Sequence, residues 1–115
     1  MFKFYGTIKI GDNMINTIDI TVKNGINEVF HAIIAYNTKI CYINNKVYTL
    51  KESFLEEFIR TIRLWKNEYG NNHKIDAEEF TVLIQTDKNE EVFHGKGIFP
   101  DNYHYFKELL GDIHD

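Results

Sequence analysis

The stretch TIDITVKNGINEVFHAIIAY, residues 17–36, decides the fold. In its first half, isoleucine and valine alternate with threonine, aspartate and lysine, which is the period of a strand with one buried face. Asn24-Gly25 then provides the strongest short hairpin signal, because both residues tolerate the positive φ of a two-residue turn. The stretch therefore predicts an antiparallel hairpin. A loop of those two residues gives the facing pairs Lys23–Ile26, Ile20–Val29 and Ile18–His31.

Further strand patterns flank this hairpin. Residues 2–10 alternate phenylalanine and isoleucine with lysine, tyrosine and threonine. Residues 39–43 and 46–50 are two short strands joined by the tight turn Asn44-Asn45. Together these segments predict about five N-terminal strands in an antiparallel meander.

The period changes after residue 50. Apolar residues from Phe54 to Trp65 recur at helical spacing. Ser53 with Glu56 forms a capping box at the expected start, and Thr49 with Glu52 is a competing start one turn earlier. The sequence Gly70-Asn71-Asn72 predicts the end of this helix. A C-terminal hairpin follows, with strands at 80–86 and 91–98, and a second helix over about 102–110 completes the chain.

These elements predict one α+β domain over residues 1–115. An antiparallel meander sheet, of about five N-terminal strands plus the C-terminal hairpin, carries both helices packed on one face. Each helix has one apolar stripe, and the sheet is the surface that can bury it.

The segment GKGIFPDNYHYFKELL, residues 95–110, has the glycines and lysine of a phosphate-binding loop. Pro100 occupies the position of the third glycine of a dinucleotide fingerprint, however. Asp101 is then the expected helix N-cap, and its carboxylate would lie where a phosphate binds. The segment therefore predicts the end of a strand, with a bulge or a close backbone approach at Gly95 and Gly97, and the start of a helix.

Composition excludes several classes of protein. Thirteen Lys and Arg against seventeen Asp and Glu give a net charge of −4, and the basic residues are dispersed. Direct nucleic-acid binding is therefore not expected, since it depends on a basic patch. The sequence has neither a membrane-length apolar run nor the apolar core of a signal peptide, and Cys41 is the sole cysteine. These features predict a cytoplasmic protein without a membrane segment.

The sequence shows no constellation of catalytic or metal-binding residues. None of the five histidines has the i, i+4 helical spacing of a metal pair, and Cys41 lies in an apolar strand. The expectation is a non-enzymatic domain with no catalytic, metal or cofactor-binding residue. His31 is expected in the core, beside Ile18 and Ile20.

The contact surface is expected on the sheet face away from the helices, because an antiparallel sheet tolerates one uncovered face. The aromatic residues, 15% of the chain, suit an interface and suit strands equally well. The partner is expected to be another protein, or a second copy of the chain in a homodimer. With Asn24-Gly25 as the loop, the candidate interface residues are Asp19, Glu28, Phe30 and Ile34.

Three segments carry a resemblance to a known group of domains. They are WKNEYG (65–70), EFTVLI (79–84) and GKGIFPDNYHYFKELL (95–110). Residues 54–110 resemble small domains of unknown function from low-GC Gram-positive bacteria and their mobile elements. The chain departs from that pattern at the acidic position before the first of these strands, because Asp76 is not followed by a glycine. The resemblance implies no activity.

The composition, rich in Asn, Ile and Lys, fits an AT-rich bacterial or phage genome. We expect a small intracellular protein-binding module, such as a phage or mobile-element inhibitor of the anti-defence or immunity type, or an accessory factor. The alternative is a domain that binds a small ligand or nucleotide in a pocket between sheet and helices.

Overall fold

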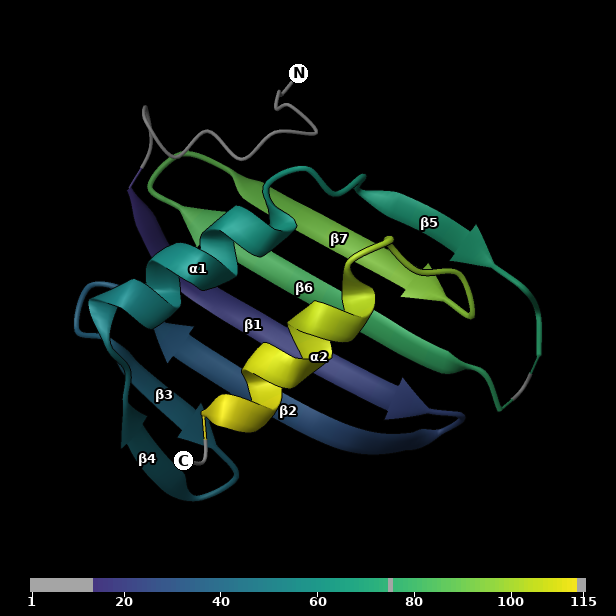
Figure 1. Cartoon of the computed structure of the whole chain (residues 1–115), viewed down its shortest axis with the longest axis horizontal. Coiled ribbons are helices and arrows are strands. Elements are labelled where there is room, and N and C mark those ends of the chain that lie inside the picture. Colours follow the sequence, from purple (N-terminus) through teal and green to yellow (C-terminus); the bar gives the residue numbers. More distant parts are fainter. Residues whose placement is uncertain (1–13, 75, 114–115) are drawn as a thin grey trace.

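A computed structural model describes residues 14–74 and 76–113. In this part of the chain, seven strands form one sheet, and two helices lie side by side across one of its faces (Figure 1). The α+β class and the placement of both helices on one face match the prediction. The strand expected over residues 2–10 lies outside the described residues.

The sheet is mixed rather than purely antiparallel. Its strand order is β4-β3-β2-β1-β6-β7-β5, and every neighbouring pair is antiparallel except β5 with β7. The bounds are β1 (Ile15–Asn24), β2 (Asn27–Ala35), β3 (Ile40–Ile43), β4 (Lys46–Thr49), β5 (Glu68–Asn71), β6 (Glu78–Thr86) and β7 (Glu90–Lys96). The sequence predicted all of these except β5, which replaces the expected end of the first helix.

The β1–β2 hairpin forms with a different register from the predicted one. Asn24 pairs with Asn27, so the turn is Gly25-Ile26, with Gly25 at a φ of 69°. The pairing then shifts between Val22 and Lys23, and Val29 is the extra residue of β2. Because strand side chains alternate in direction, this shift moves the side chains of β2 to the opposite face from the predicted one.

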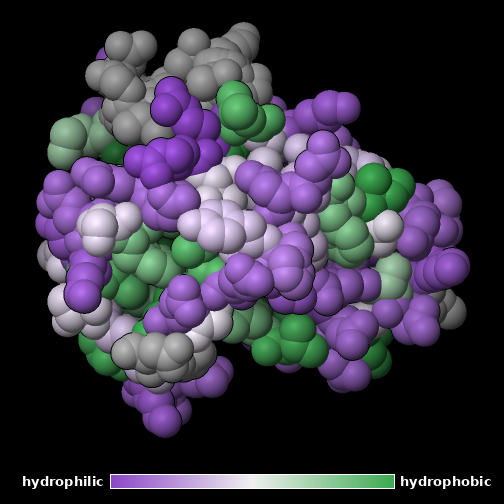
Figure 2. Space-filling view, viewed as in Figure 1, coloured by the Kyte–Doolittle hydropathy of each residue, from purple (hydrophilic) through white to green (hydrophobic). Residues whose placement is uncertain are grey.

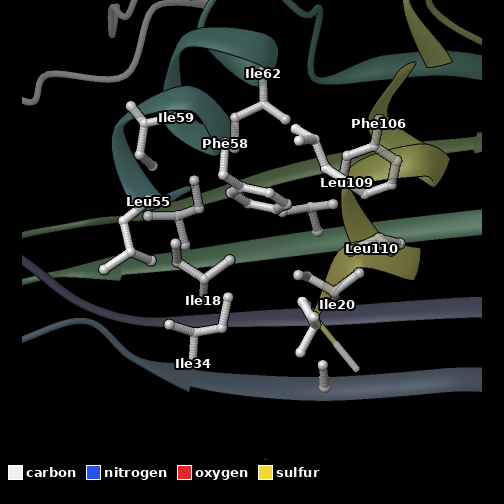
Figure 3. Packing of buried hydrophobic residues seen from close by; sticks show 14 of the residues in the cluster. Ile18, Ile20, Ile34, Leu55, Phe58, Ile59, Ile62, Phe106, Leu109 and Leu110 are labelled. Carbon is white, nitrogen blue, oxygen red and sulfur yellow. The ribbon is translucent and has the colours of Figure 1, made fainter. Parts of the chain in front are cut away.

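The core lies between the sheet and the helices α1 (Glu52–Ile62) and α2 (Tyr103–Asp112). Buried isoleucines of β1 and β2 face the apolar stripes of both helices (Figure 3). The residues labelled in this contact are Ile18, Ile20, Ile34, Leu55, Phe58, Ile59, Ile62, Phe106, Leu109 and Leu110. Burial of these stripes is the main stabilising term, at about 25 cal/mol per Å² of apolar surface.

Both helix starts differ from their predicted caps. Lys51 is the N-cap of α1, so Ser53 lies inside the helix and the predicted capping box is wrong. Asn102, rather than Asp101, is the N-cap of α2. The Asn102 side chain accepts a hydrogen bond from Trp65 Nε1 at 2.6 Å and donates one to the Thr61 carbonyl at 2.8 Å. It therefore joins the start of α2 to the end of α1.

The segment 95–110 is the end of a strand and the start of a helix, as predicted. At Gly95, an added Cβ would lie 2.4 Å from the Ile98 carbonyl oxygen and 2.7 Å from the Phe80 ring. A side chain does not fit there, which confirms the expected close approach.

Candidate functional site

The candidate site is the sheet face opposite the helices, which we call the open face. Along β1, Ile18, Ile20 and Val22 point into the core, so the alternate residues Thr17, Asp19 and Thr21 point to the open face. The cross-strand pairing extends this assignment to all the remaining strands of the sheet. The helix-covered side presents a mostly hydrophilic surface with scattered hydrophobic patches (Figure 2).

A line of apolar side chains crosses the open face. Cross-strand pairs link one position of each strand from β4 to β7, in the order Val47, Tyr42, Ile33, Asp19, Leu83 and Val92. We call its five apolar members the apolar row. Val47 is 61% exposed, Tyr42 46%, Val92 42% and Ile33 37%, while Leu83 is half-buried. Core residues of the same strands are at most 5% exposed, so the row is accessible surface on the sheet.

Asp19 interrupts the apolar row at the central strand. Its Oδ1 lies 3.0 Å from Nε2 of His31 on β2, and each side chain is 38% exposed. His31 was expected in the core, and its place on the open face corrects that prediction. The register shift in the hairpin is the cause, because it pairs His31 with Thr21.

A second histidine lies between two carboxylates at the β5 side of the open face. His94 Nδ1 is 2.9 Å from Glu68 Oε2, and its Nε2 is 2.6 Å from Glu79 Oε2. Partial burial lowers the pKa of His94, but the hydrogen bonds with Glu79 and Glu68 outweigh it, so the net shift is upward. The hydrogen bond from His94, with one from the Gly70 backbone N–H, lowers the pKa of Glu68. A protonated His94 therefore bridges three neighbouring strands.

The charged residues around the apolar row are mostly acidic. Cross-strand pairing and side-chain hydrogen bonds place both signs of charge on the open face. The described strand residues there are the acids Asp19, Glu28, Glu68, Glu79 and Glu90 and the lysines Lys23 and Lys96. The open face thus has an apolar centre and a predominantly acidic border.

The structure separates the four predicted interface residues. Asp19 and Glu28 belong to the open face, but Phe30 packs half-buried against the core and Ile34 is fully buried under the helices. The placement of Phe30 and Ile34 on an exposed face was wrong, because the register shift reverses β2. The sequence reasoning also missed the apolar row itself. The only local signal for the row is the alternation of side-chain direction within β3 and β4. The register between strands is also needed to place its residues in one line.

Cys41 does not contribute a nucleophile to this face. Its side chain is fully buried on the helix side, and burial raises the pKa of the thiol to about 11. The thiolate, which is the reactive form, is therefore disfavoured at neutral pH. Across residues 14–74 and 76–113, no group of three or more His, Cys, Asp and Glu side chains is arranged to hold a metal ion. No helix in the same part of the chain has the length and apolarity to cross a membrane.

Comparison with protein-family models, with curated proteins and with solved structures finds no match for this chain, so its function is inferred from its own residues.

Proposed function

We propose that this chain is a non-enzymatic, intracellular protein-binding module that engages a partner protein through its open face. The apolar row is the observation that carries the proposal. Monomeric proteins rarely leave contiguous large apolar side chains in water, and where they do, the patch often marks a contact surface. A solvated sheet face normally carries polar side chains. An aligned row of Val, Tyr, Ile and Leu departs from that pattern and favours a surface that a partner covers.

The dimensions of the molecule suit such a contact. Its principal extents are 37, 35 and 21 Å, and the sheet lies across the two longer ones (Figure 1). A stable protein interface buries about 800 Å² on each partner, which the open face is wide enough to supply. Tyr42 is the natural anchor, since tyrosine buries a large rigid ring while its hydroxyl keeps a polar partner.

The charge of the open face indicates the chemistry of the partner. An apolar centre with an acidic border is complementary to a protein surface that has an apolar centre and lysine or arginine around it. The net charge of −4 would steer a basic partner toward this chain, so association should be faster at low ionic strength. An inhibitor of the anti-defence or immunity type, or an accessory factor, is the role that we propose for such a module.

The test compares two double variants, each of which replaces two exposed apolar residues with asparagine. Tyr42→Asn with Val47→Asn removes the β3–β4 end of the apolar row. Ile26→Asn with Leu64→Asn is the matched control, because these residues are 93% and 85% exposed and lie outside the strands. Each tagged variant and the wild type is used as bait in an extract of the source cells. Bound proteins are identified, and each complex is then rebuilt from purified components.

The proposal requires a complex that forms with the wild type and the control but is lost in the row variant. A complex that survives the row substitutions undiminished would place the interface elsewhere. Sizing of the purified chain across concentrations distinguishes a second copy from a foreign protein. A dimer that the same row substitutions dissociate would make the partner another copy of this chain.

A further inference from the structure

A hollow of about 420 Å³ lies away from the open face, on the helix side of the molecule. It is bounded by parts of the segment between β5 and β6, by the start of β6, by the segment between β7 and α2, and by the first half of α2; these elements can be followed in Figure 1. Side chains that line it include Asn72, Lys74, Glu78, Phe99, Tyr103 and Lys107. Its volume falls in the range of small-molecule sites, which is about 300–1,000 Å³.

The floor of the hollow is aromatic and is fixed to the core. The Phe99 and Tyr103 rings stack with centroids 4.4 Å apart and planes 13° from parallel. Tyr103 also contacts the fully buried rings of Phe80 and Phe106, at 5.1 and 5.8 Å. Phe99 remains partly exposed. The floor therefore offers a preformed apolar surface that needs no rearrangement to accept a flat molecule.

The polar groups beside this floor leave an excess of positive charge. Glu78 Oε2 accepts hydrogen bonds from the Tyr103 hydroxyl at 2.5 Å and from Lys107 Nζ at 2.8 Å. Its charge is therefore balanced by Lys107, whose ammonium group also lies 5.5 Å from the centre of the Tyr103 ring. Lys74 adds a second exposed cation at the rim. The hollow is thus locally positive, although the whole chain has a net charge of −4.

The wall of the hollow depends on Gly97. This residue has a φ of 72°, and an added Cβ would lie 1.8 Å from Asn72 Nδ2. The Asn72 side chain thus packs directly on the Gly97 backbone, and Gly97 donates a backbone hydrogen bond to the Glu78 carbonyl at 2.9 Å. These contacts hold the rim and the floor in one arrangement.

We infer that this hollow binds a small planar aromatic molecule that carries an anionic group. The aromatic part would lie against Phe99, and the anion would pair with Lys74 at the rim. Aromatic carboxylates and nucleoside monophosphates share this chemistry. The inference goes beyond the proposed protein contact and does not depend on it, because none of the lining residues belongs to the apolar row.

The test titrates the isotope-labelled chain with AMP and with benzoate, followed by backbone amide chemical shifts. Adenosine, benzyl alcohol and inorganic phosphate are the controls, since each lacks either the anion or the ring. We expect AMP or benzoate to perturb the amides around Phe99, Tyr103 and Lys107, and the three control compounds to do so more weakly. Perturbation by AMP alone or by benzoate alone identifies which source of the anion the hollow accepts.

Lys74→Glu should weaken that binding by roughly tenfold, because a hydrogen bond to a charged group contributes on the order of one power of ten in affinity. Lys66→Glu is the matched control, with the same change of charge at another exposed lysine outside the hollow, and should bind like wild type. Phe99→Leu should also weaken binding, with the melting temperature checked in parallel. The inference is overturned if neither AMP nor benzoate perturbs these amides, if phosphate alone binds equally well, or if Lys74→Glu has no more effect than Lys66→Glu.

Discussion

At the scale of single residues, Trp65 connects several elements of the core. It lies beyond the end of α1 and is only 3% exposed. Its ring meets Phe106 at 4.9 Å, Phe80 at 5.4 Å and Phe93 at 6.3 Å, so it touches α2, β6 and β7. The indole N–H is satisfied by Asn102 Oδ1. A buried aromatic with a satisfied polar group combines area burial with a fixed orientation.

Trp65→Ala should lower the free energy of unfolding by about 3–5 kcal/mol, since truncation of a buried aromatic opens a cavity and orphans a hydrogen-bond partner. That is a large share of a total that is typically about 5–15 kcal/mol. Urea unfolding followed by circular dichroism measures the change. Leu64→Ala is the neighbouring control at an 85% exposed side chain, and should stay within about 0.5 kcal/mol of wild type. Equal stabilities for the two variants would show that Trp65 does not pack as described.

At the scale of elements, β5 is a short edge strand that is held by few contacts within the sheet. It has four residues, lies at the edge of the sheet, and pairs with β7 in the only parallel ladder of the described strands. His94 reinforces this edge, because its two nitrogens reach Glu68 on β5 and Glu79 on β6. The strand therefore depends partly on the protonation of one side chain.

The stability of this edge should change with pH in a defined direction. The folded-state pKa of His94 is raised, so its contribution is complete below the unfolded value of about 6.5 and is lost as pH rises through the folded value. The pKa of Glu68 is lowered, so its contribution is present above the unfolded value of about 4.3 and is lost as pH falls through the folded value. The edge should be most stable between these limits.

His94→Gln should therefore lose more stability relative to wild type at about pH 5.5 than at about pH 8. Urea unfolding at both values measures the difference. His104→Gln serves as the control, because His104 is a histidine on α2 with an 89% exposed side chain. A loss that is the same at both pH values, or equal in the two variants, would contradict the role assigned to His94.

At the scale of the whole molecule, sequence patterns predicted which helices and strands form better than they predicted the register between paired strands. Asn24-Gly25 correctly located the hairpin, yet the turn formed one residue later and the extra residue Val29 reversed the faces of β2. Local alternation does not encode such a shift. β5 carries no periodic pattern in its four residues and owes its pairing to β7, which is distant in sequence. Trp65 was correctly expected in the core, although α1 ends at Ile62, before this residue, and not at Gly70 as the pattern predicted.

The candidate site shows the same limit. Asp19 and Glu28 were placed on the correct face, while Phe30 and Ile34, which face the core, were assigned to the exposed face. The apolar row is built from single residues of different strands, from Val47 on β4 to Val92 on β7. Each of these residues alone is an ordinary surface position. Only the register, which the whole sheet determines, brings them into one line.

Hydroxyl-radical footprinting of the complex isolated with the wild-type bait tests the proposed contact most directly. Tyr42 and Tyr105 form a matched pair, since they are 46% and 41% exposed and lie on the open face and on α2, respectively. The proposal predicts that complex formation protects Tyr42 from oxidation and leaves Tyr105 at its level in the free chain. Protection of Tyr105 with Tyr42 unchanged, or an absence of any complex in which Tyr42 is protected, would contradict it.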